Sequence, residues 1–131
     1  MNTVTAPLFS PASEWSGRND GPGPEHARWH SSIDTASSPT ADAVHLIGFA
    51  SDEGVERNGG RQGAAQGPAA LRAALGSLAV HEPRKLIDAG TVTTQDDDLE
   101  TAQREVSDRV RDLVAAQGSA CLLYTSPSPR D

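Results

Sequence analysis

The side chains with the clearest chemical potential lie in the loop Gly54–Arg61, which is rich in glycine, arginine and asparagine. The loop follows a short apolar run and precedes a segment with helical patterning. In α/β folds such a loop lies outside the carboxyl end of a strand, where ligands usually bind. Arg57, Asn58 and Arg61 supply N–H donors suited to a carboxylate, which arginine binds through two parallel hydrogen bonds. We therefore predict that these three residues bind substrate.

A purely structural interpretation of the same loop stays open. Its glycines permit positive φ in a tight crossing, and no partner for its arginines can be identified from sequence. The glycine spacing approaches that of a phosphate-binding P-loop, but Gly60-Arg61 stands where Lys-Ser/Thr would contact phosphate and magnesium. No G-x-G-x-x-G fingerprint is present either, so nucleotide binding is not predicted.

Two groups of residues have spacings seen in metal sites. Asp96-Asp97-Asp98 directly precedes a helical pattern, where acids stabilise the positive end of the helix dipole, so capping is the favoured interpretation. Glu25, His26 and His30 have helical spacing, but a further ligand is missing and prolines interrupt the segment. No serine or cysteine nucleophile has a recognisable context. We predict no catalytic residue and no metal ligand within this chain.

Composition limits the kind of protein and its partners. The chain has 131 residues, a formal net charge of -7 and one cysteine. Its acidity argues against a nucleic-acid backbone as partner, and no window is long and apolar enough for a membrane span. A single cysteine fits a reducing compartment. We expect a cytoplasmic protein that acts on a small molecule, with no nucleic-acid or membrane partner.

The order of apolar segments predicts the fold class. It reads as strand, loop, helix, strand, helix and a further strand, which implies an α/β fold with a parallel sheet. The elements are expected at Val44–Phe49, from Gly67-Pro68 onward, at Lys85–Gly90, from an Asp97/Glu100 capping box to Gly118, and after Gly118.

The two helices are expected to bury one apolar face each. Leu71, Leu75 and Leu78 recur at the spacing of one face of the first helix. The second helix has a longer stripe, consisting of Leu99, Ala102, Val106, Val110, Leu113 and Val114. His45, within the first strand, is expected to be a hydrogen-bonded interior residue.

The chain divides into three regions. Residues 1–41 form a polar segment that is expected to contribute no core element, although its Trp- and His-rich stretch Trp15–His30 should dock on the domain. Residues 42–120 form the first β-α-β-α part of a larger domain. Residues 121–131 resemble one reading frame of a sequencing-library adapter, so the natural sequence is expected to be cut at or near Ala120.

Separated sequence blocks carry a resemblance to a known family from Trp15 to Gly118. The blocks are Trp15–Pro22, Arg28–His30, Gly48–Val55, Arg57–Arg61, Gly63–Pro68 and Asp88–Gly90. Gly63–Pro68 resembles the arginase/agmatinase (ureohydrolase) family as a whole. The blocks Trp15–Pro22 and Arg28–His30 resemble its formimidoylglutamase branch in particular.

The resemblance implies the N-terminal part of a three-layer α/β/α arginase-like fold. It implies a homo-oligomeric enzyme with two manganese ions that hydrolyses N-formimidoyl-L-glutamate to L-glutamate and formamide in histidine degradation. Arg57, Asn58 and Arg61 would border the active-site mouth and help to hold the glutamate carboxylates.

The family's metal ligands lie in Gly-Gly-His, Asp-x-His-x-Asp and Asp-x-Asp motifs, and the first of these is expected just after Ala120. Asp96 and Asp98 precede a helix and are not assigned to the last motif. The chain by itself is therefore expected to be inactive. A fragment of agmatinase or another ureohydrolase stays open as an alternative, as does a small non-catalytic module that binds anions at the Gly67-Pro68 helix start.

Overall fold

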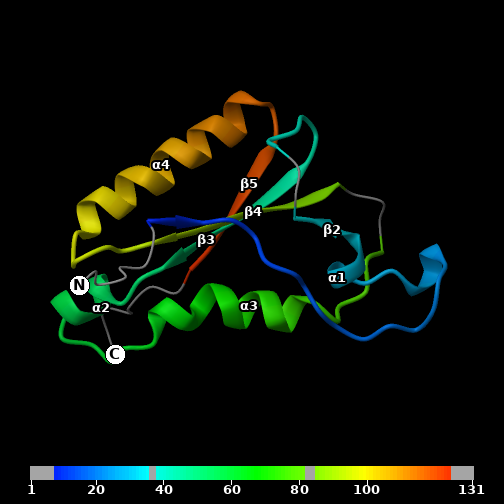
Figure 1. The fold of residues 1–131 in the computed structure, drawn as a ribbon, viewed down its shortest axis with the longest axis horizontal. Helices are drawn as coiled ribbons and strands as arrows, with labels where there is room; N and C mark the ends of the chain where they lie inside the picture. Colours follow the sequence, from blue (N-terminus) through cyan, green and yellow to red (C-terminus); the bar gives the residue numbers. More distant parts are fainter. Residues whose placement is uncertain (1–7, 36–37, 82–84, 125–131) are drawn as a thin grey trace, which may run out of the picture.

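The computed structural model describes residues 8–35, 38–81 and 85–124 as a sheet with helices on both faces (Figure 1). In chain order the elements are β1 (Phe9–Ser10), η1 (Pro24–His26), α1 (Trp29–Ser32), β2 (Ile33–Asp34), β3 (Val44–Ala50), α2 (Glu53–Arg57), η2 (Ala64–Gln66), α3 (Gly67–Leu75), β4 (Leu86–Thr93), α4 (Leu99–Ala115) and β5 (Ser119–Leu123). Helix α4 covers one face of the sheet and α3 covers the other (Figure 1). The predicted α/β class is confirmed.

The sheet is mostly parallel, with the order β1-β4-β3-β5. Strand β3 pairs in parallel with both β4 and β5, so a strand does follow Gly118. Three of its residues, Cys121, Leu122 and Leu123, belong to the tail that resembles adapter sequence. Two short strands share the outer edge of β4: β2 runs parallel to its first residues and β1 runs antiparallel to its later ones. The predicted parallel sheet is confirmed for β2, β3, β4 and β5, and the antiparallel β1 is an addition to it.

The expectation that residues 1–41 contribute no core element is wrong. The core on the α4 side contains Ile47, Val92 and Ala102, and Phe9 packs against this cluster from β1. Strands of two residues are too short to produce an alternating pattern, so sequence periodicity could not reveal them. What places them is the unpaired edge of β4, whose backbone groups they satisfy.

Strand β4 continues past the glycine at which the sequence suggested an end. Its pairing with β3 shifts register, so that Ile47 faces two residues, Ala89 and Gly90, which defines a β-bulge. Gly90 has φ of 98°, and a Cβ there would lie 2.5 Å from the Phe9 ring. The glycine therefore permits the bulge and the close approach of β1, and does not terminate the strand.

Helix α3 starts at Gly67-Pro68 as predicted, but it does not bury the predicted leucines. Leu71 and Leu78 are 38% and 51% exposed, and Leu78 lies beyond the end of the helix. The buried contact is made by Pro68, because a Cβ at Gly48 on β3 would meet the Pro68 ring and the Arg72 guanidinium. Arg72, which sequence reasoning left without a role, thus lies on the face that contacts the sheet.

Helix α4 confirms most of its predicted stripe but differs at both ends. Its N-cap is Asp98, whose carboxylate accepts a hydrogen bond from the Thr101 amide, so the capping box predicted at Asp97 and Glu100 is wrong. At the other end Val114 is 58% exposed, and Gln117, with φ of 66°, makes the left-handed turn. Gly118 is required instead because a Cβ there would collide with the His45 ring.

Candidate functional site

The carboxyl ends of β3 and β4 meet at one edge of the sheet, at the left of Figure 1. Helix α2, the η2 turn and the start of α4 surround this carboxyl edge. A shallow hollow of about 230 Å³ opens there, lined by Ala50, Ser51, Asp52, Glu53, Glu56, Ala65, Thr94, Asp96 and Asp97. Ligands of open α/β sheets bind at this kind of edge, which makes it the candidate site.

The segment 54–61, predicted to be one loop, consists of a short helix followed by a loop. Residues 53–57 form the short helix α2, so the expectation of a loop over all of residues 54–61 is wrong. Asp52 precedes the helix, and its carboxylate accepts hydrogen bonds from the amides of Gly63 (2.8 Å) and Ala65 (3.1 Å). These backbone donors lower the pKa of Asp52 below its ordinary value. The aspartate thereby anchors the far end of the loop beside β3.

Arg57 ends α2, and each nitrogen of its guanidinium donates to a group of this chain. Its Nε donates to Glu53 (2.9 Å), Nη1 donates to Glu100 (2.6 Å) and Nη2 donates to the Asp97 carbonyl (3.1 Å). The hydrogen bond to Glu100, followed by that to Glu53, raises the pKa of Arg57 further above its ordinary value. Arg57 therefore joins the segment after β3 to the segment after β4.

Asn58 and Arg61, the other predicted binding residues, are both exposed. The Asn58 amide closes the end of α2 by donating to the Gly54 carbonyl (3.2 Å), and its side chain has no hydrogen bond within the described residues. Arg61 makes no hydrogen bond or ion pair with any residue that the structure describes. The structure thus places the three residues near the carboxyl edge, with the Arg57 side chain hydrogen-bonded to other residues and the other two side chains exposed to solvent.

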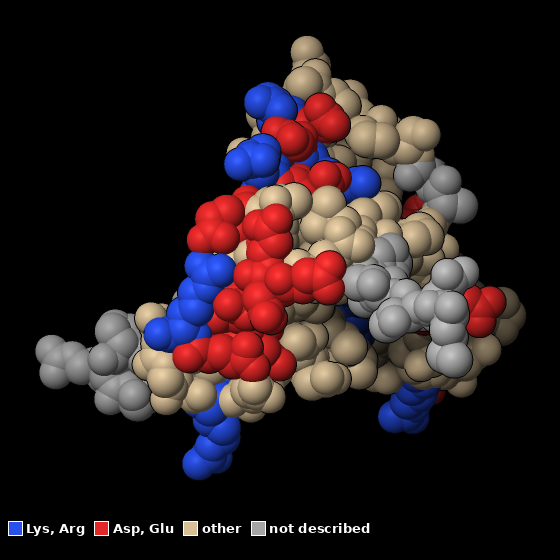
Figure 2. All heavy atoms as spheres, turned by 60° about the vertical axis from the view of Figure 1, so that its left-hand side comes forward, with Lys and Arg blue, Asp and Glu red and all other residues tan. Residues whose placement is uncertain are grey.

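Acidic side chains gather over this edge (Figure 2). Glu53, Glu56 and Asp97 each bring a carboxylate oxygen within 4.8 Å of the others. Partial desolvation, and then repulsion by Glu53 and Asp97, raise the pKa of Glu56. Next to them, Arg57 lowers the pKa of Glu100 by hydrogen bonding. Several carboxylates therefore lie close together at this edge, and Arg57 pairs with two of them, Glu53 and Glu100.

The acidic cluster does not reproduce the histidine and aspartate ligand set that the resemblance implies. Oxygen donors of its kind suit hard divalent cations, but exposed acids also cluster without an ion. The described histidines near the sheet are engaged elsewhere: His45 is fully buried, and its Nε2 accepts from the Thr40 amide while Nδ1 donates to the Ser119 carbonyl. This confirms His45 as a hydrogen-bonded interior residue.

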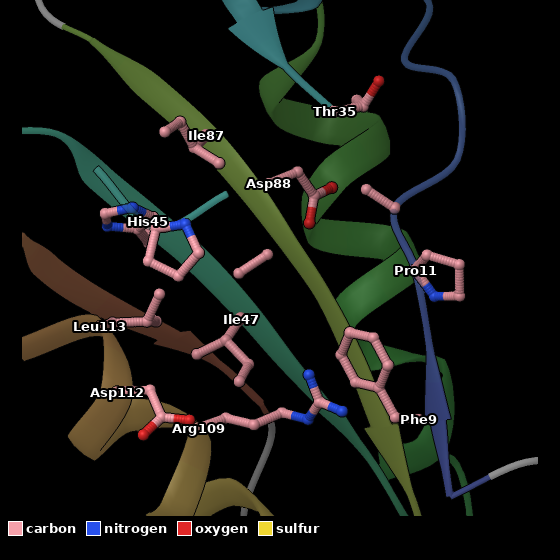
Figure 3. A pocket seen from close by; sticks show the side chains of 13 residues that line it. Phe9, Pro11, Thr35, His45, Ile47, Ile87, Asp88, Arg109, Asp112 and Leu113 are labelled. Carbon is pink, nitrogen blue, oxygen red and sulfur yellow. The ribbon is translucent and has the colours of Figure 1, made fainter. Parts of the chain in front are cut away.

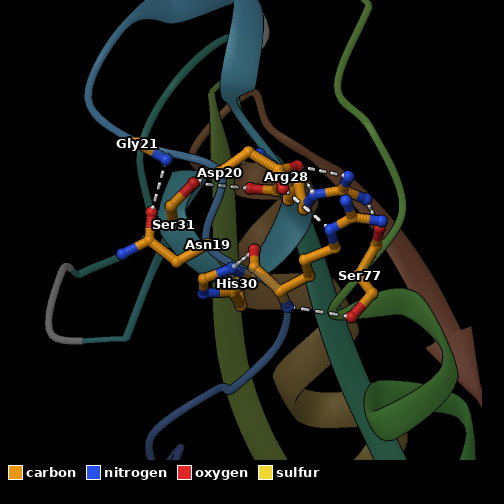
Figure 4. A network of polar contacts seen from close by, with 8 residues as sticks. Asn19, Asp20, Gly21, Arg28, His30, Ser31 and Ser77 are labelled. Carbon is orange, nitrogen blue, oxygen red and sulfur yellow. Dashed lines mark hydrogen bonds and ion pairs between the residues drawn. The ribbon is translucent and has the colours of Figure 1, made fainter.

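The His-rich segment likewise forms no common site. His30 Nε2 donates to the Arg18 carbonyl (2.7 Å), whereas His26 lies 3.6 Å from Glu25. The Arg18 and His30 contacts belong to a network that also contains Arg28, Asp20 and Ser77 (Figure 4). Arg28 binds Asp20 through two nitrogens and also donates to the Ser77 carbonyl. The role of this network is structural.

That network lies at the opposite end of the sheet from the acidic cluster. Backbone hydrogen bonds join Trp29 and His30 to Leu78 and Gly76, just past the end of α3, and β2 pairs with the first residues of β4. The Trp15 and Trp29 rings stack with their centroids 6.3 Å apart. Most residues of the blocks that resembled the formimidoylglutamase branch therefore lie away from the candidate site. Trp15 and Ser16 are different, because they line a cavity of about 460 Å³ together with Ala50 and Ala65, which also line the candidate hollow.

A buried ion pair, which sequence reasoning missed, links the N-terminal segment to the sheet. Arg72 on α3 contacts both carboxylate oxygens of Asp88 (2.9 and 3.0 Å), whose side chain is only 1% exposed. Arg72 also donates to Thr91 Oγ1 (2.6 Å) and the Gly90 carbonyl (2.8 Å). Trp15 Nε1 donates to Asp88 Oδ2 (2.8 Å). The one available sequence signal was a lone aspartate in an apolar strand.

The β-bulge makes this arrangement possible. Asp88 and Thr91 are three positions apart, so in a regular strand their side chains would point to opposite faces. The extra residue at the bulge turns both toward α3, where Arg72 contacts them. The Gly90 amide also donates to Asp88 (2.9 Å), so the bulge supplies part of the pair's hydrogen bonding.

Another cavity, of about 270 Å³, lies on the α4 side of the sheet (Figure 3). Apolar side chains such as Phe9, Ile47, Ile87 and Leu113 form much of its wall. The Arg109 guanidinium lies 3.2 Å from the Phe9 ring centroid and also binds Glu105 (2.8 Å). Its two buried ionisable side chains, His45 and Asp88, are hydrogen-bonded to other groups of this chain, so we interpret the cavity as a packing feature beside β1.

The fold and the position of the candidate site define an α/β protein whose ligand edge is formed by the carboxyl ends of parallel strands. The model of the arginase family matches residues 42–123, and the chain belongs to that family. None of the helices in the described part of the chain is both long and apolar enough to span a bilayer.

Within the arginase family, the chain is similar to several formimidoylglutamases. The chain is 50% identical to the formimidoylglutamase of Rhodococcus jostii (strain RHA1) over 101 residues. This aligned region covers 73% of this chain and 30% of that protein. It is 46% identical over 107 residues to the formimidoylglutamase of Nocardia farcinica (strain IFM 10152), covering 81% of this chain and 34% of the relative. It is 47% identical over 103 residues to that of Chromobacterium violaceum, with 78% and 33% covered. The chain thus spans about a third of these relatives' length.

Proposed function

We propose that this chain is the N-terminal part of a formimidoylglutamase, which hydrolyses N-formimidoyl-L-glutamate to L-glutamate and formamide. The observation that carries the proposal is its identity of 46–50% to formimidoylglutamases over about three quarters of its length. Family membership alone would support only a hydrolase of the arginase type. The finer assignment rests on these relatives and on the sequence blocks at Trp15–Pro22 and Arg28–His30.

The carboxyl edge is the proposed place for the substrate. We propose that the segment carrying Arg57, Asn58 and Arg61 borders the active-site mouth and helps to hold the glutamate carboxylates. An arginine can bind a carboxylate with two parallel hydrogen bonds, and Arg61 is exposed and has no partner among the described residues. In the intact enzyme two manganese ions would supply activated water for attack on the formimidoyl carbon.

The metal, the oligomeric state and the location are proposed for the whole protein. The family's Gly-Gly-His and Asp-x-His-x-Asp motifs do not occur among these 131 residues, so manganese is proposed for the whole protein and not for the described site. A homo-oligomer is proposed from the resemblance alone. A cytoplasmic location is proposed because the chain before the adapter-like tail has no cysteine, which fits a reducing compartment.

The test is an activity assay of the protein expressed from its intact gene. N-formimidoyl-L-glutamate and agmatine are supplied separately, with and without added manganese after chelation. We expect glutamate and formamide from the first substrate and no urea from the second, with activity lost on chelation and restored by manganese. Hydrolysis of agmatine in place of formimidoylglutamate would favour the agmatinase alternative, which the relatives named above do not support.

The binding segment has its own test in the same enzyme. Arg61→Ala should raise KM for N-formimidoyl-L-glutamate by about tenfold, the cost of about 1.4 kcal/mol of lost charge-assisted hydrogen bonding. Arg111→Ala is the matched control, because Arg111 is exposed on α4 and pairs only with Asp108 among the described residues. Unchanged KM and kcat in the Arg61 variant would remove this segment from the proposed site.

A further inference from the structure

Two arginines of the same segment differ in how many contacts they make. Every guanidinium nitrogen of Arg57 donates a hydrogen bond to Glu53, Glu100 or the Asp97 carbonyl. Arg61, four positions later, has no such contact within the described residues. A group whose donors are already used is poorly suited to bind a substrate anion, because it must first release its partners.

The contacts of Arg57 connect parts of the chain that are distant in sequence. Glu53 lies one helical turn before Arg57, whereas Glu100 lies 43 positions after it, in the first turn of α4. The segment after β3 is thereby tied to the segment after β4. The planar fork of arginine suits this task, since it directs several donors at once to fixed acceptors.

A second anchor holds the same segment at its other end. Asp52, directly before α2, accepts from the amides of Gly63 and Ala65. Residues 58–62, which include Arg61, therefore lie between the Arg57 contacts and the Asp52 contacts. A loop held at both ends loses less conformational entropy when it binds a ligand, so its affinity is higher than that of a free loop.

We propose that Arg57 is a positioning residue that latches the segment 58–62 to the start of α4, and that Arg61 alone of the two arginines meets a carboxylate of the substrate. The proposal rests on the proposed function for the identity of the substrate. The latch itself does not depend on that identity, because all its contacts lie within this chain.

Glu100→Gln separates the latch from direct binding. If Arg57 contacted substrate, this change would release its guanidinium and leave KM unchanged or lower. If Arg57 is a latch, Arg57→Gln and Glu100→Gln should act alike: both should raise KM severalfold with kcat nearly unchanged. Arg57→Lys keeps the charge without the fork and should lie between the unaltered protein and Arg57→Gln.

Hydrogen exchange supplies a readout that does not depend on catalysis. The amides of Asn58, Gly59 and Gly60 donate to Gly54, Glu56 and Val55 at the end of α2. In the protein expressed from its intact gene, both latch variants should speed exchange of these amides by roughly two- to fivefold, the range expected for loss of an exposed ion pair. Arg61→Gln should raise KM without changing this exchange, and the control Arg111→Gln should change neither quantity.

The outcomes distinguish the two proposals. Faster exchange in both latch variants supports the latch even if the unaltered protein does not hydrolyse N-formimidoyl-L-glutamate, in which case the proposed function alone is lost. Unchanged exchange in both variants overturns the latch. So does a raised KM in Arg57→Gln together with an unchanged KM in Glu100→Gln, because Arg57 would then act on the substrate itself.

Discussion

Arg57 and Arg72 each bind carboxylate oxygens through several nitrogens, but their surroundings are opposite. The Arg72 side chain is 17% exposed and its partner Asp88 is 1% exposed. The corresponding values for Arg57 and Glu100 are 44% and 64%. Breaking a buried pair leaves an uncompensated charge in a low-dielectric interior, whereas an exposed pair is replaced by water at little cost. Similar chemistry therefore gives a rigid contact in one place and an adjustable one in the other.

The two arginines also connect different parts of the fold. Arg72 fixes α3 against β4 and, through Asp88, fixes the N-terminal segment at Trp15. Arg57 acts at the rim, between segments that follow β3 and β4. The buried pair therefore secures the fold, whereas the exposed pair orders one segment at the rim, and its loss should leave the fold intact.

The largest expected effect comes from breaking the buried pair. Arg72→Met keeps most of the side-chain volume but leaves the Asp88 carboxylate with only Trp15 and the Gly90 amide as described donors. We expect unfolding to become easier by about 3–5 kcal/mol, measured by denaturant titration. Arg111→Met, at an exposed position, is the control and should be within about 0.5 kcal/mol of the unaltered protein. An equal loss of unfolding free energy in Arg72→Met and Arg111→Met would contradict the difference proposed between buried and exposed ion pairs.

The bulge that supports the buried pair should be nearly as sensitive. Gly90→Ala places a Cβ at φ of 98°, 2.5 Å from the Phe9 ring and 2.6 Å from the Ser10 carbonyl oxygen. The expected loss is about 2–3 kcal/mol in the free energy of unfolding, from backbone strain and the displacement of β1. Gly54→Ala is the matched control, because a Cβ there meets nothing within 4 Å. That variant should be neutral or slightly more stable, since alanine favours the helix.

Trp15→Phe tests how strongly the buried pair holds the N-terminal segment. The change keeps an aromatic ring for stacking on Trp29 but removes the donor to Asp88. We expect a loss of about 1–2 kcal/mol, the contribution of a hydrogen bond to a charged acceptor. Trp29→Phe should cost less, because no hydrogen bond of its indole is found among the described residues. A larger loss for Trp29→Phe would show that stacking, not the bond to Asp88, holds the segment.

The smallest effects are expected from titration of the rim. Asp52 and Glu100 have pKa values below the ordinary 3.8 and 4.5, because they accept hydrogen bonds from loop amides and from Arg57, respectively. Their contribution to stability is present above those ordinary values and is lost as the pH falls through the lower folded values. Glu56 has a raised pKa, so its protonation favours the folded state as the pH falls. Glu56→Gln should therefore slightly stabilise the protein at neutral pH, and thermal melts from pH 3 to 7 would measure both trends; a destabilised variant at pH 7 would contradict the assigned repulsion.

Much of the central fold could be predicted from sequence because its signals are local. The apolar run at Val44–Phe49 and the Gly-Pro start of α3 identify elements through burial and backbone preference, without knowledge of their neighbours. The interior position of His45 followed from its place in that strand. Helix α4 was recognisable from its period, although its cap was misplaced by one residue because three consecutive aspartates offer equivalent caps.

The candidate site was predictable only in its location. Loop position indicated the carboxyl edge and selected Arg57, Asn58 and Arg61, whose role in binding stays a prediction. Sequence could not reveal that Arg57 is engaged by Glu100, since that partner lies 43 positions away. The face of α3 was misjudged for a similar reason: leucine spacing indicates a possible apolar face, but the contact with Gly48 decided which face is buried.

What the sequence determined by itself is the order of the elements and the family, since both follow from residues close together in the chain or from ordered blocks of them. Tertiary structure alone decided the partners of the charged side chains, the placement of two short strands on the β4 edge, and the bulge that turns Asp88 and Thr91 to one face. The physical reason is that an ion pair or a strand edge is satisfied by whichever group lies within a few ångströms, and chain folding, not sequence separation, sets that distance.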